Sequence, residues 1–336
     1  MNITVLGAGT WGTALTILLA SNGHNVTLWS ALSKEVDSLN ADRKNIKNLP
    51  GAELPVSVCV TGDINAALSE KPEIIVFAVA SVFVRSTAAL LKNLIPDGQI
   101  IVNVAKGIEE STLYTLCDVI KDELKTAQVC ILSGPTHAEE VSLKMPTTIV
   151  AGAERENTAK LIQDTFMNEY FRVYTSPDVL GIELGGSLKN VIALAAGIAD
   201  GMGFGDNAKA ALMTRGIAEI SRLGIKMGGK AETFNGLSGI GDLIVTCTSR
   251  HSRNRNAGYL MGQGKTCEEA VKEVGQVVEG IYCARAAKLL ADKYNVEMPI
   301  VEQINLILFE NKDAVRAVKD LFSRDKRIEH YSLNWD

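Results

Sequence analysis

One short segment of the chain combines a carboxylate with side chains that bind anions. It reads LSGIGDLIVTCTSRHSRNR over residues 237–255, and it contains Asp242, Ser252, Arg253 and Asn254. A guanidinium group presents its N–H groups in one plane, which suits a carboxylate or a phosphate. The segment predicts an anion site close to an acid. A solvated basic loop is the alternative that these residues alone leave open.

A lysine within an apolar helical pattern is a second candidate for chemistry. Lys189 lies in GIELGGSLKNVIALAAGIADG, where helical spacing places it on one face with two alanines and Asp200. Burial of an ammonium group is costly unless the group is paired, so a lysine at such a position can acquire a shifted pKa and act as an acid or base. A lysine that reaches solvent is the alternative.

The first residues carry a glycine pattern typical of dinucleotide sites. VLGAGTWG places Gly7, Gly9 and Gly12 as G-x-G-x-x-G between an apolar strand pattern and an amphipathic helix. These glycines permit a tight turn, close approach of a pyrophosphate and close packing of helix on strand. The N-terminus of the helix adds free N–H groups and partial positive charge. A plain tight turn is the alternative to a dinucleotide site.

The position that selects between NAD and NADP lacks the usual acid. An NAD enzyme usually ends its second strand with Asp or Glu, which holds the ribose 2′-OH. Here Trp29 is followed by Ser30 and Lys34, and the first acid is Glu35. Nothing in this pattern repels a 2′-phosphate, so we expect NADPH to be accepted at least as readily as NADH. The alternative is that Lys34 only lies at the start of a helix and has no role in the choice of cofactor.

The order of the expected elements indicates two domains. Apolar strand-like runs occur at 3–7, 25–29, 73–79, 99–105, 129–134 and 147–152, with helical patterns between several of them. Such alternation is typical of a parallel sheet covered on both faces. Helical spacing then dominates at 183–200, 206–223, 254–262, 266–274, 280–293, 299–309 and 312–321. We predict an α/β Rossmann domain with a doubly wound, mostly parallel sheet over 1–182, and an all-α domain over 183–336.

Composition argues against several classes of function. The 336 residues carry a net charge of −5 without a basic stripe, so we expect no nucleic-acid partner. The apolar runs are shorter than the roughly 20 residues of a membrane helix, and no charged leader precedes the first run, so we expect neither membrane insertion nor a signal peptide. Six cysteines without zinc-like spacing and four scattered histidines predict free buried thiols and no metal.

Six motifs occur in the order known from one enzyme family. They are GAGTWG, NVAKGIE, SGPTHAEEV, ELGGSLKNVIALAAGI, NGLSGIGDLIVTCTSRHSRNR and GQVVEGIYCARA, and they extend over nearly the whole chain. In these motifs the chain resembles the NAD(P)-dependent glycerol-3-phosphate dehydrogenases of bacterial type. The GGSLKN and GIGDL…SRNR blocks are specific to that family, whereas the glycine pattern is shared with many others. The chain departs from the family at Ala31, where members often carry Arg or His.

The resemblance implies a role for individual residues. It implies that Lys189 is the proton donor or acceptor, and that Asp242 and Lys106 border the reacting carbonyl. The implied substrate-binding residues are Lys106, Gly134, Thr136, Lys189, Asp242, Ser252, Arg253 and Asn254. The implied cofactor-binding residues are Gly7, Gly9, Thr10, Trp11, Gly12, Lys106, Ala138, Arg253, Val277 and Glu279. These roles agree with chemistry, because an ammonium group stabilises and protonates the alkoxide that hydride transfer creates.

The resemblance also implies an activity, a location and an assembly. The activity is reversible reduction of dihydroxyacetone phosphate to sn-glycerol 3-phosphate by NADPH or NADH, which supplies glycerophospholipid synthesis. A phosphate dianion would suit Arg253. We expect a cytoplasmic homodimer. Two rival functions remain: a related dehydrogenase of a hydroxy acid such as 3-hydroxyisobutyrate or 6-phosphogluconate, and a cofactor-sensing protein without turnover.

Overall fold

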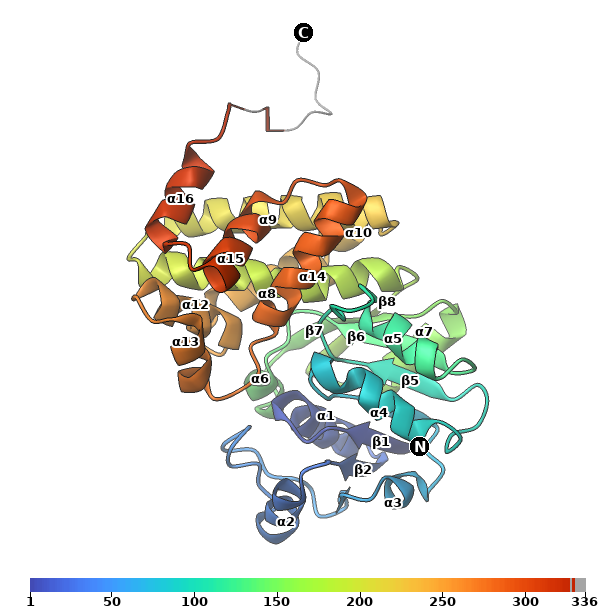
Figure 1. Cartoon of the computed structure of the whole chain (residues 1–336). Helices are drawn as coiled ribbons and strands as arrows, with labels where there is room; N and C mark the ends of the chain where they lie inside the picture. The colour runs from blue at the N-terminus through green and yellow to red at the C-terminus, as the bar shows by residue number, and fades with distance from the viewer. Residues whose placement is uncertain (327, 330–336) are drawn as a thin grey trace.

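The computed structural model consists of a sheet with flanking helices and a helical part stacked on one edge of it (Figure 1). It describes residues 1–326, 328 and 329. The strands are β1 (Asn2–Leu6), β2 (Asn25–Trp29), β3 (Cys59–Thr61), β4 (Ile74–Phe77), β5 (Ile100–Asn103), β6 (Gln128–Ser133), β7 (Thr147–Gly152) and β8 (Phe171–Ser176). They form one sheet in the order β3-β2-β1-β4-β5-β6-β7-β8, in which β6 and β7 alone pair antiparallel among the described strands. The prediction of a doubly wound, mostly parallel sheet is confirmed.

The central strands have apolar side chains on both faces of the sheet. Alternate residues of β4 belong to two different apolar clusters, Ile74 and Val76 to one, Ile75 and Phe77 to the other. Helices cover both clusters, which is why these strands read as continuous apolar runs. The helices of this part are α1 (Thr10–Ser21), α2 (Ser33–Asp42), α3 (Ile64–Leu68), α4 (Val84–Leu91), α5 (Leu116–Glu123), α6 (Ala138–Ser142) and α7 (Glu156–Phe166), with a short 3₁₀ helix, η1, at Ser81–Phe83.

The helical part is built around one long buried helix, α8 (Val179–Gly201), which lies between the sheet and the other helices (Figure 1). Around it are α9 (Asp206–Met227), α10 (Ala231–Phe234), a π-helical turn (Leu237–Gly241), α11 (Asp242–Thr248), α12 (Arg253–Gly262), α13 (Cys267–Val274), α14 (Glu279–Tyr294), α15 (Pro299–Glu310) and α16 (Ala314–Phe322). Glycines let α12 lie very close to α8: a Cβ on Gly197 would stand 2.0 Å from the carbonyl oxygen of Arg255. This close approach brings the start of α12 to the middle of α8.

Two details differ from the sequence prediction. Strands β3 and β8 were not expected: β3 has only three residues, and β8 alternates buried with exposed side chains instead of forming an apolar run. Helix α11 was also missed. The predicted domain boundary after residue 182 falls inside the first turn of α8, and this division stays a prediction. Residues 327 and 330–336 of the predicted second domain lie outside the described ones.

Helix α8 also exceeds the length of the apolar runs seen in the sequence. Within the described part of the chain it is the one helix that is long and apolar enough to cross a membrane, with 23 residues and a mean hydropathy of 1.4 over its best window. That window is 89% buried inside the structure, among the helices that surround α8. The apolar character of α8 is therefore accounted for by packing.

Candidate active site

The glycine turn lies at the point where the strand order reverses. Strand β1 pairs with β2 on one side and with β4 on the other, and ligands of doubly wound sheets bind outside the carboxyl ends of strands at such a point. Gly7 has φ +112°, and a Cβ there would stand 2.8 Å from the carbonyl of Ala78. A Cβ on Gly9 would meet nothing within 4 Å. The turn is thus closed on the sheet side and open at Gly9, which fits a pyrophosphate at the start of α1.

Two further residues implied for the cofactor adjoin this turn. Thr10 and Trp11 form the first positions of α1. The ring of Trp11 packs against the small apolar cluster that contains Ala138, the first residue of α6. Three of the implied cofactor residues, Thr10, Trp11 and Ala138, therefore lie at or next to the N-terminal end of α1.

The end of β2 is more acidic than its sequence indicates. Ser30 is buried, and its hydroxyl donates a hydrogen bond to the carboxylate of Glu35 in the first turn of α2. The amide of Asn48 donates to the other oxygen of that carboxylate, at 2.9 Å. The sequence places the first acid after Trp29 at Glu35, and the structure brings the carboxylate of Glu35 back to Ser30, the position that directly follows the strand.

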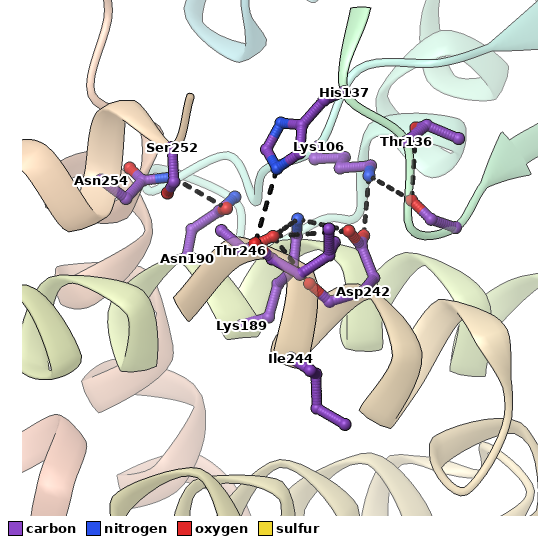
Figure 2. A network of polar contacts seen from close by, with 12 residues as sticks. Lys106, Thr136, His137, Lys189, Asn190, Asp242, Ile244, Thr246, Ser252 and Asn254 are labelled. Atoms are coloured by element: carbon purple, nitrogen blue, oxygen red, sulfur yellow. Dashed lines mark hydrogen bonds and ion pairs between the residues drawn. The ribbon is translucent and has the colours of Figure 1, made fainter. Parts of the chain in front are cut away.

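Lys189, Asp242 and Lys106 form a buried ion triad (Figure 2). One carboxylate oxygen of Asp242 accepts from Lys189 Nζ at 2.6 Å, and the other accepts from Lys106 Nζ at 2.7 Å. Lys189 is 5% exposed and Asp242 is 1% exposed, whereas Lys106 is half-buried. Two ammonium groups thus share one carboxylate, and only Lys106 reaches the surface.

Three separate elements supply the triad. Lys189 projects from the middle of α8, Asp242 begins α11, and Lys106 follows β5 in the sheet. A Cβ on Gly185 would stand 2.6 Å from the carbonyl oxygen of Ser238, so this glycine lets α8 approach the π-helical turn that precedes Asp242. The triad therefore joins the sheet to the helical part.

Burial changes the acid–base properties of Lys189. Loss of solvent lowers the pKa of its ammonium group to about 8; Asp242 opposes this change, and the positive charge of Lys106 adds to it. The ammonium group also donates to the hydroxyl of Thr246 at 2.5 Å, and that hydroxyl donates to the backbone carbonyl of Asp242 at 2.6 Å. Lys189 is thus held in place while its pKa lies close to physiological pH, as expected for an acid–base group.

The loop after β6 adjoins the triad on its open side (Figure 2). The carbonyl of Gly134 accepts from Lys106 Nζ at 3.1 Å and from the hydroxyl of Thr136 at 3.3 Å. His137 follows, with its ring Nε2 3.5 Å from the carbonyl oxygen of Val245. Burial, and then the charge of Lys189, lower the pKa of His137, so the ring is held neutral. Sequence analysis did not single out His137 or Thr246; the spacing of Thr246 four residues after Asp242 was the available signal.

Within the SRNR block three of the four side chains have a hydrogen-bond or salt-bridge partner in the protein. Ser252 caps α12 by accepting from the backbone N–H of Arg255. The amide of Asn254 donates to Asn190 at 2.9 Å, and its oxygen accepts from the N–H of Gly280 at 2.8 Å. Arg255 is bound to Asp200. Exposed Arg253 makes no hydrogen bond or salt bridge to any other residue that the structure describes. The fork of Arg253 is thus the one in this block that remains available to a ligand.

Glu279 connects the start of α14 to the sheet. Its carboxylate accepts from the backbone N–H of Ser81 at 3.0 Å and from the Ser81 hydroxyl, at the beginning of η1 after β4. Burial raises the pKa of Glu279, and the bonds from Ser81 and the charge of Arg253 oppose the rise. Val277 is half-buried two residues earlier. Glu279 thus joins the start of α14 to the segment that follows β4.

The structure brings Lys106, Gly134, Lys189 and Asp242 into direct contact, and it joins Asn254 to α8 and to the start of α14. Among residues 1–326, 328 and 329 no group of three or more His, Cys, Asp or Glu side chains could hold a metal ion. The six cysteines are free thiols; four of them are buried as predicted, whereas Cys59 is exposed and Cys267 is half-buried.

Comparison with known proteins identifies the family. The family model described as NAD-dependent glycerol-3-phosphate dehydrogenase N-terminus matches residues 2–159, and the one described as the C-terminus matches 178–319. The glycerol-3-phosphate dehydrogenases (NAD(P)+) of Agathobacter rectalis and Fusobacterium nucleatum are 60% and 57% identical to this chain, over 99% and 98% of both lengths. A crystal structure of glycerol-3-phosphate dehydrogenase from Coxiella burnetii superposes with a TM-score of 0.93 at 38% identity, over 96% of this chain and 99% of its own. The chain therefore belongs to the family of NAD-dependent glycerol-3-phosphate dehydrogenases and is an NAD(P)-dependent oxidoreductase.

Proposed function

We propose that this protein reduces dihydroxyacetone phosphate to sn-glycerol 3-phosphate with NADPH or NADH, reversibly, and that the product supplies glycerophospholipid synthesis. The observation that carries the proposal is the buried triad of Lys189, Asp242 and Lys106, together with the glycine turn before α1 and the exposed guanidinium of Arg253. This arrangement offers a proton donor for a ketone and a cation for a phosphate. Family membership supports the same substrate.

Lys189 is the proposed proton donor. When bound, the dinucleotide supplies a hydride to the carbonyl carbon of the substrate. Lys189 Nζ then gives a proton to the carbonyl oxygen, so that the C=O bond becomes CH–OH, and the reverse reaction returns that proton to a neutral lysine. Asp242 keeps the ammonium charged and oriented, and Lys106 adds positive charge where the alkoxide develops.

The proposed phosphate site is the start of α12. Arg253 offers a planar pair of donors to a phosphate dianion, and the N-terminal end of α12 adds the partial positive charge of its helix. Ser252 and Asn254 complete this site in the proposal, although each already makes a hydrogen bond that shapes the start of the helix. Gly134 and Thr136, next to Lys106, would contact the other end of the three-carbon chain.

The proposed cofactor site extends from the glycine turn to Glu279. Gly7, Gly9 and Gly12 with Thr10 and Trp11 would hold the pyrophosphate, and Ala138 would contact the cofactor beside Trp11. Lys106, Arg253, Val277 and Glu279 would contact it from the side of the triad. The proposal also includes a cytoplasmic location, a homodimer, and the division of the chain into domains 1–182 and 183–336.

A single assay separates this function from its rivals. Oxidation of NADPH and NADH is followed with dihydroxyacetone phosphate and with unphosphorylated dihydroxyacetone. Reduction of NADP+ and NAD+ is followed with 3-hydroxyisobutyrate and 6-phosphogluconate. We expect turnover of dihydroxyacetone phosphate well above that of dihydroxyacetone and none with the hydroxy acids. Turnover of a hydroxy acid alone would assign the related dehydrogenase, and cofactor binding without turnover would assign a sensing protein.

A further inference from the structure

We propose that Glu35 makes this enzyme prefer NADH to NADPH, because its carboxylate occupies the place where a 2′-phosphate would lie. The NAD(P) dependence of the family leaves this preference open, and the sequence pattern favours NADPH. The structure points the other way. The carbonyl of Trp29 accepts from the N–H of Gly7 at 2.8 Å, so the end of β2 lies directly against the glycine turn. Ser30, the next residue, holds Glu35 there.

Two independent contacts hold the carboxylate of Glu35 at this position. Buried Ser30 donates to one oxygen, while its own hydroxyl oxygen accepts from the N–H of Leu32 at 3.2 Å. Asn48 donates to the other oxygen from a separate loop. That loop is in turn attached to the glycine turn, because Asn45 donates to the carbonyl of Ala8 at 2.7 Å. The carboxylate is thus held by the end of β2 and by the loop that is bonded to the turn, and the exposure of Glu35 is intermediate.

The chemistry of this position favours a ribose with a free 2′-OH. Each oxygen of the carboxylate accepts one protein hydrogen bond and retains a lone pair for a hydroxyl group. A 2′-phosphate carries about −1.5 to −2 charges at pH 7 and would be repelled by the carboxylate. Ala31 supplies no donor that could offset this repulsion, and the side chain of Lys34 is exposed to solvent. The acid that binds the ribose 2′-OH usually stands at the end of the second strand. Here Ser30 stands at that position, and α2 supplies the acid, Glu35.

The test compares Glu35→Gln with Asp37→Asn. Glutamine keeps the size of the side chain and its hydrogen bonding but removes the charge. Asp37 is an exposed acid on the same helix, two positions and therefore about 200° further round, and it serves as the matched control. Dissociation constants for NADH and NADPH are measured by fluorescence titration without substrate, and kcat/KM is measured for both cofactors.

We expect wild type to bind NADH more tightly than NADPH. Glu35→Gln should shift the ratio of the two affinities at least about tenfold toward NADPH, because it removes one charge-assisted contact to the ribose and one repulsion of the 2′-phosphate. Asp37→Asn should leave the ratio unchanged. Ala31→Arg should favour NADPH strongly only together with Glu35→Gln, because alone the arginine would be neutralised by Glu35. A wild type that binds NADPH as tightly as NADH would overturn the proposal. So would equal weakening of both cofactors in Glu35→Gln, which would assign Glu35 a structural role. Neither result would affect the proposed reduction of the ketone.

Discussion

Replacement of Asp242 by asparagine is the strongest perturbation of the proposed mechanism. The carboxylate of Asp242 lies 2.6 Å from one ammonium group and 2.7 Å from another, and its side chain is almost fully buried. Asparagine has nearly the same shape and still accepts a hydrogen bond, but it leaves two cations close together without a counter-charge. The pKa of Lys189, already lowered to about 8 by burial, should therefore fall further.

The size of this fall follows from Coulomb's law. One pair of opposite charges about 4 Å apart, at an effective dielectric constant of about 20, is worth about 4 kcal/mol. Since one pKa unit equals about 1.4 kcal/mol, the pKa of Lys189 should drop by about three units, to about 5. The charged fraction of Lys189 at pH 7 then falls from about nine-tenths to about one-hundredth. Reduction, which needs the ammonium form, should slow by roughly a hundredfold at pH 7.

The assay is the pH dependence of kcat/KM for dihydroxyacetone phosphate with a saturating cofactor. In wild type the rate of reduction should decline as pH rises through about 8, while the reverse oxidation, which needs neutral Lys189, should increase over the same range. In Asp242→Asn both transitions should move to lower pH. Circular dichroism and cofactor titration establish that the variant folds, and Asp206→Asn, an exposed acid at the start of α9, is the control. A folded Asp242→Asn enzyme with the wild-type pH profile would refute this account of Lys189.

Other predictions concern the phosphate site, the link to α14 and stability. Arg253→Ala should lower kcat/KM for dihydroxyacetone phosphate by roughly tenfold to a hundredfold and leave kcat/KM for dihydroxyacetone nearly unchanged. Arg255→Ala should instead reduce thermal stability, since Arg255 pairs with Asp200. Ser81→Ala removes the hydroxyl that bonds the carboxylate of Glu279 and should therefore weaken NADH binding in titrations. The same substitution should have no effect in a Glu279→Gln background, because the two residues act together. Burial raises the pKa of Glu183 and of Glu219 to about 7, above the value in the unfolded chain, so melting temperatures should fall as pH rises from about 4.5 to 7, less so in the two glutamine variants.

Residue types and local spacing were sufficient for much of the architecture. The apolar runs of β1 and β4 and the glycine turn are local signals, because a strand buried on both faces must be apolar throughout and a helix that adjoins a pyrophosphate needs glycine at set positions. Lys189 was likewise singled out by its apolar neighbours. The short β3 and the half-exposed β8 carry no comparable signal, since neighbouring strands determine that such segments pair.

The chemistry of the site depends on contacts between distant residues, which spacing does not reveal. Asp242 and Lys106 are 136 residues apart, and they meet because α11 and the loop after β5 adjoin the same face of α8. The two arginines of the SRNR block are equivalent in sequence, yet Arg255 is paired with Asp200, whereas the side chain of Arg253 makes no hydrogen bond or salt bridge within the described chain. Only the position of α12 against α8 distinguishes them.

The position of the triad has a consequence for the order of events in catalysis. Lys106 follows strand β5 of the sheet, which carries the proposed cofactor site, while Lys189 and Asp242 come from the helical part, which carries the proposed phosphate site. Movement of the sheet away from the helices would remove Lys106 from Asp242, and with it a positive charge that lowers the pKa of Lys189. The pKa of the proton donor is therefore coupled to the contact between the two parts. The acid would be strongest when both parts are in contact around the substrate, which is the state in which the alkoxide forms and must be protonated.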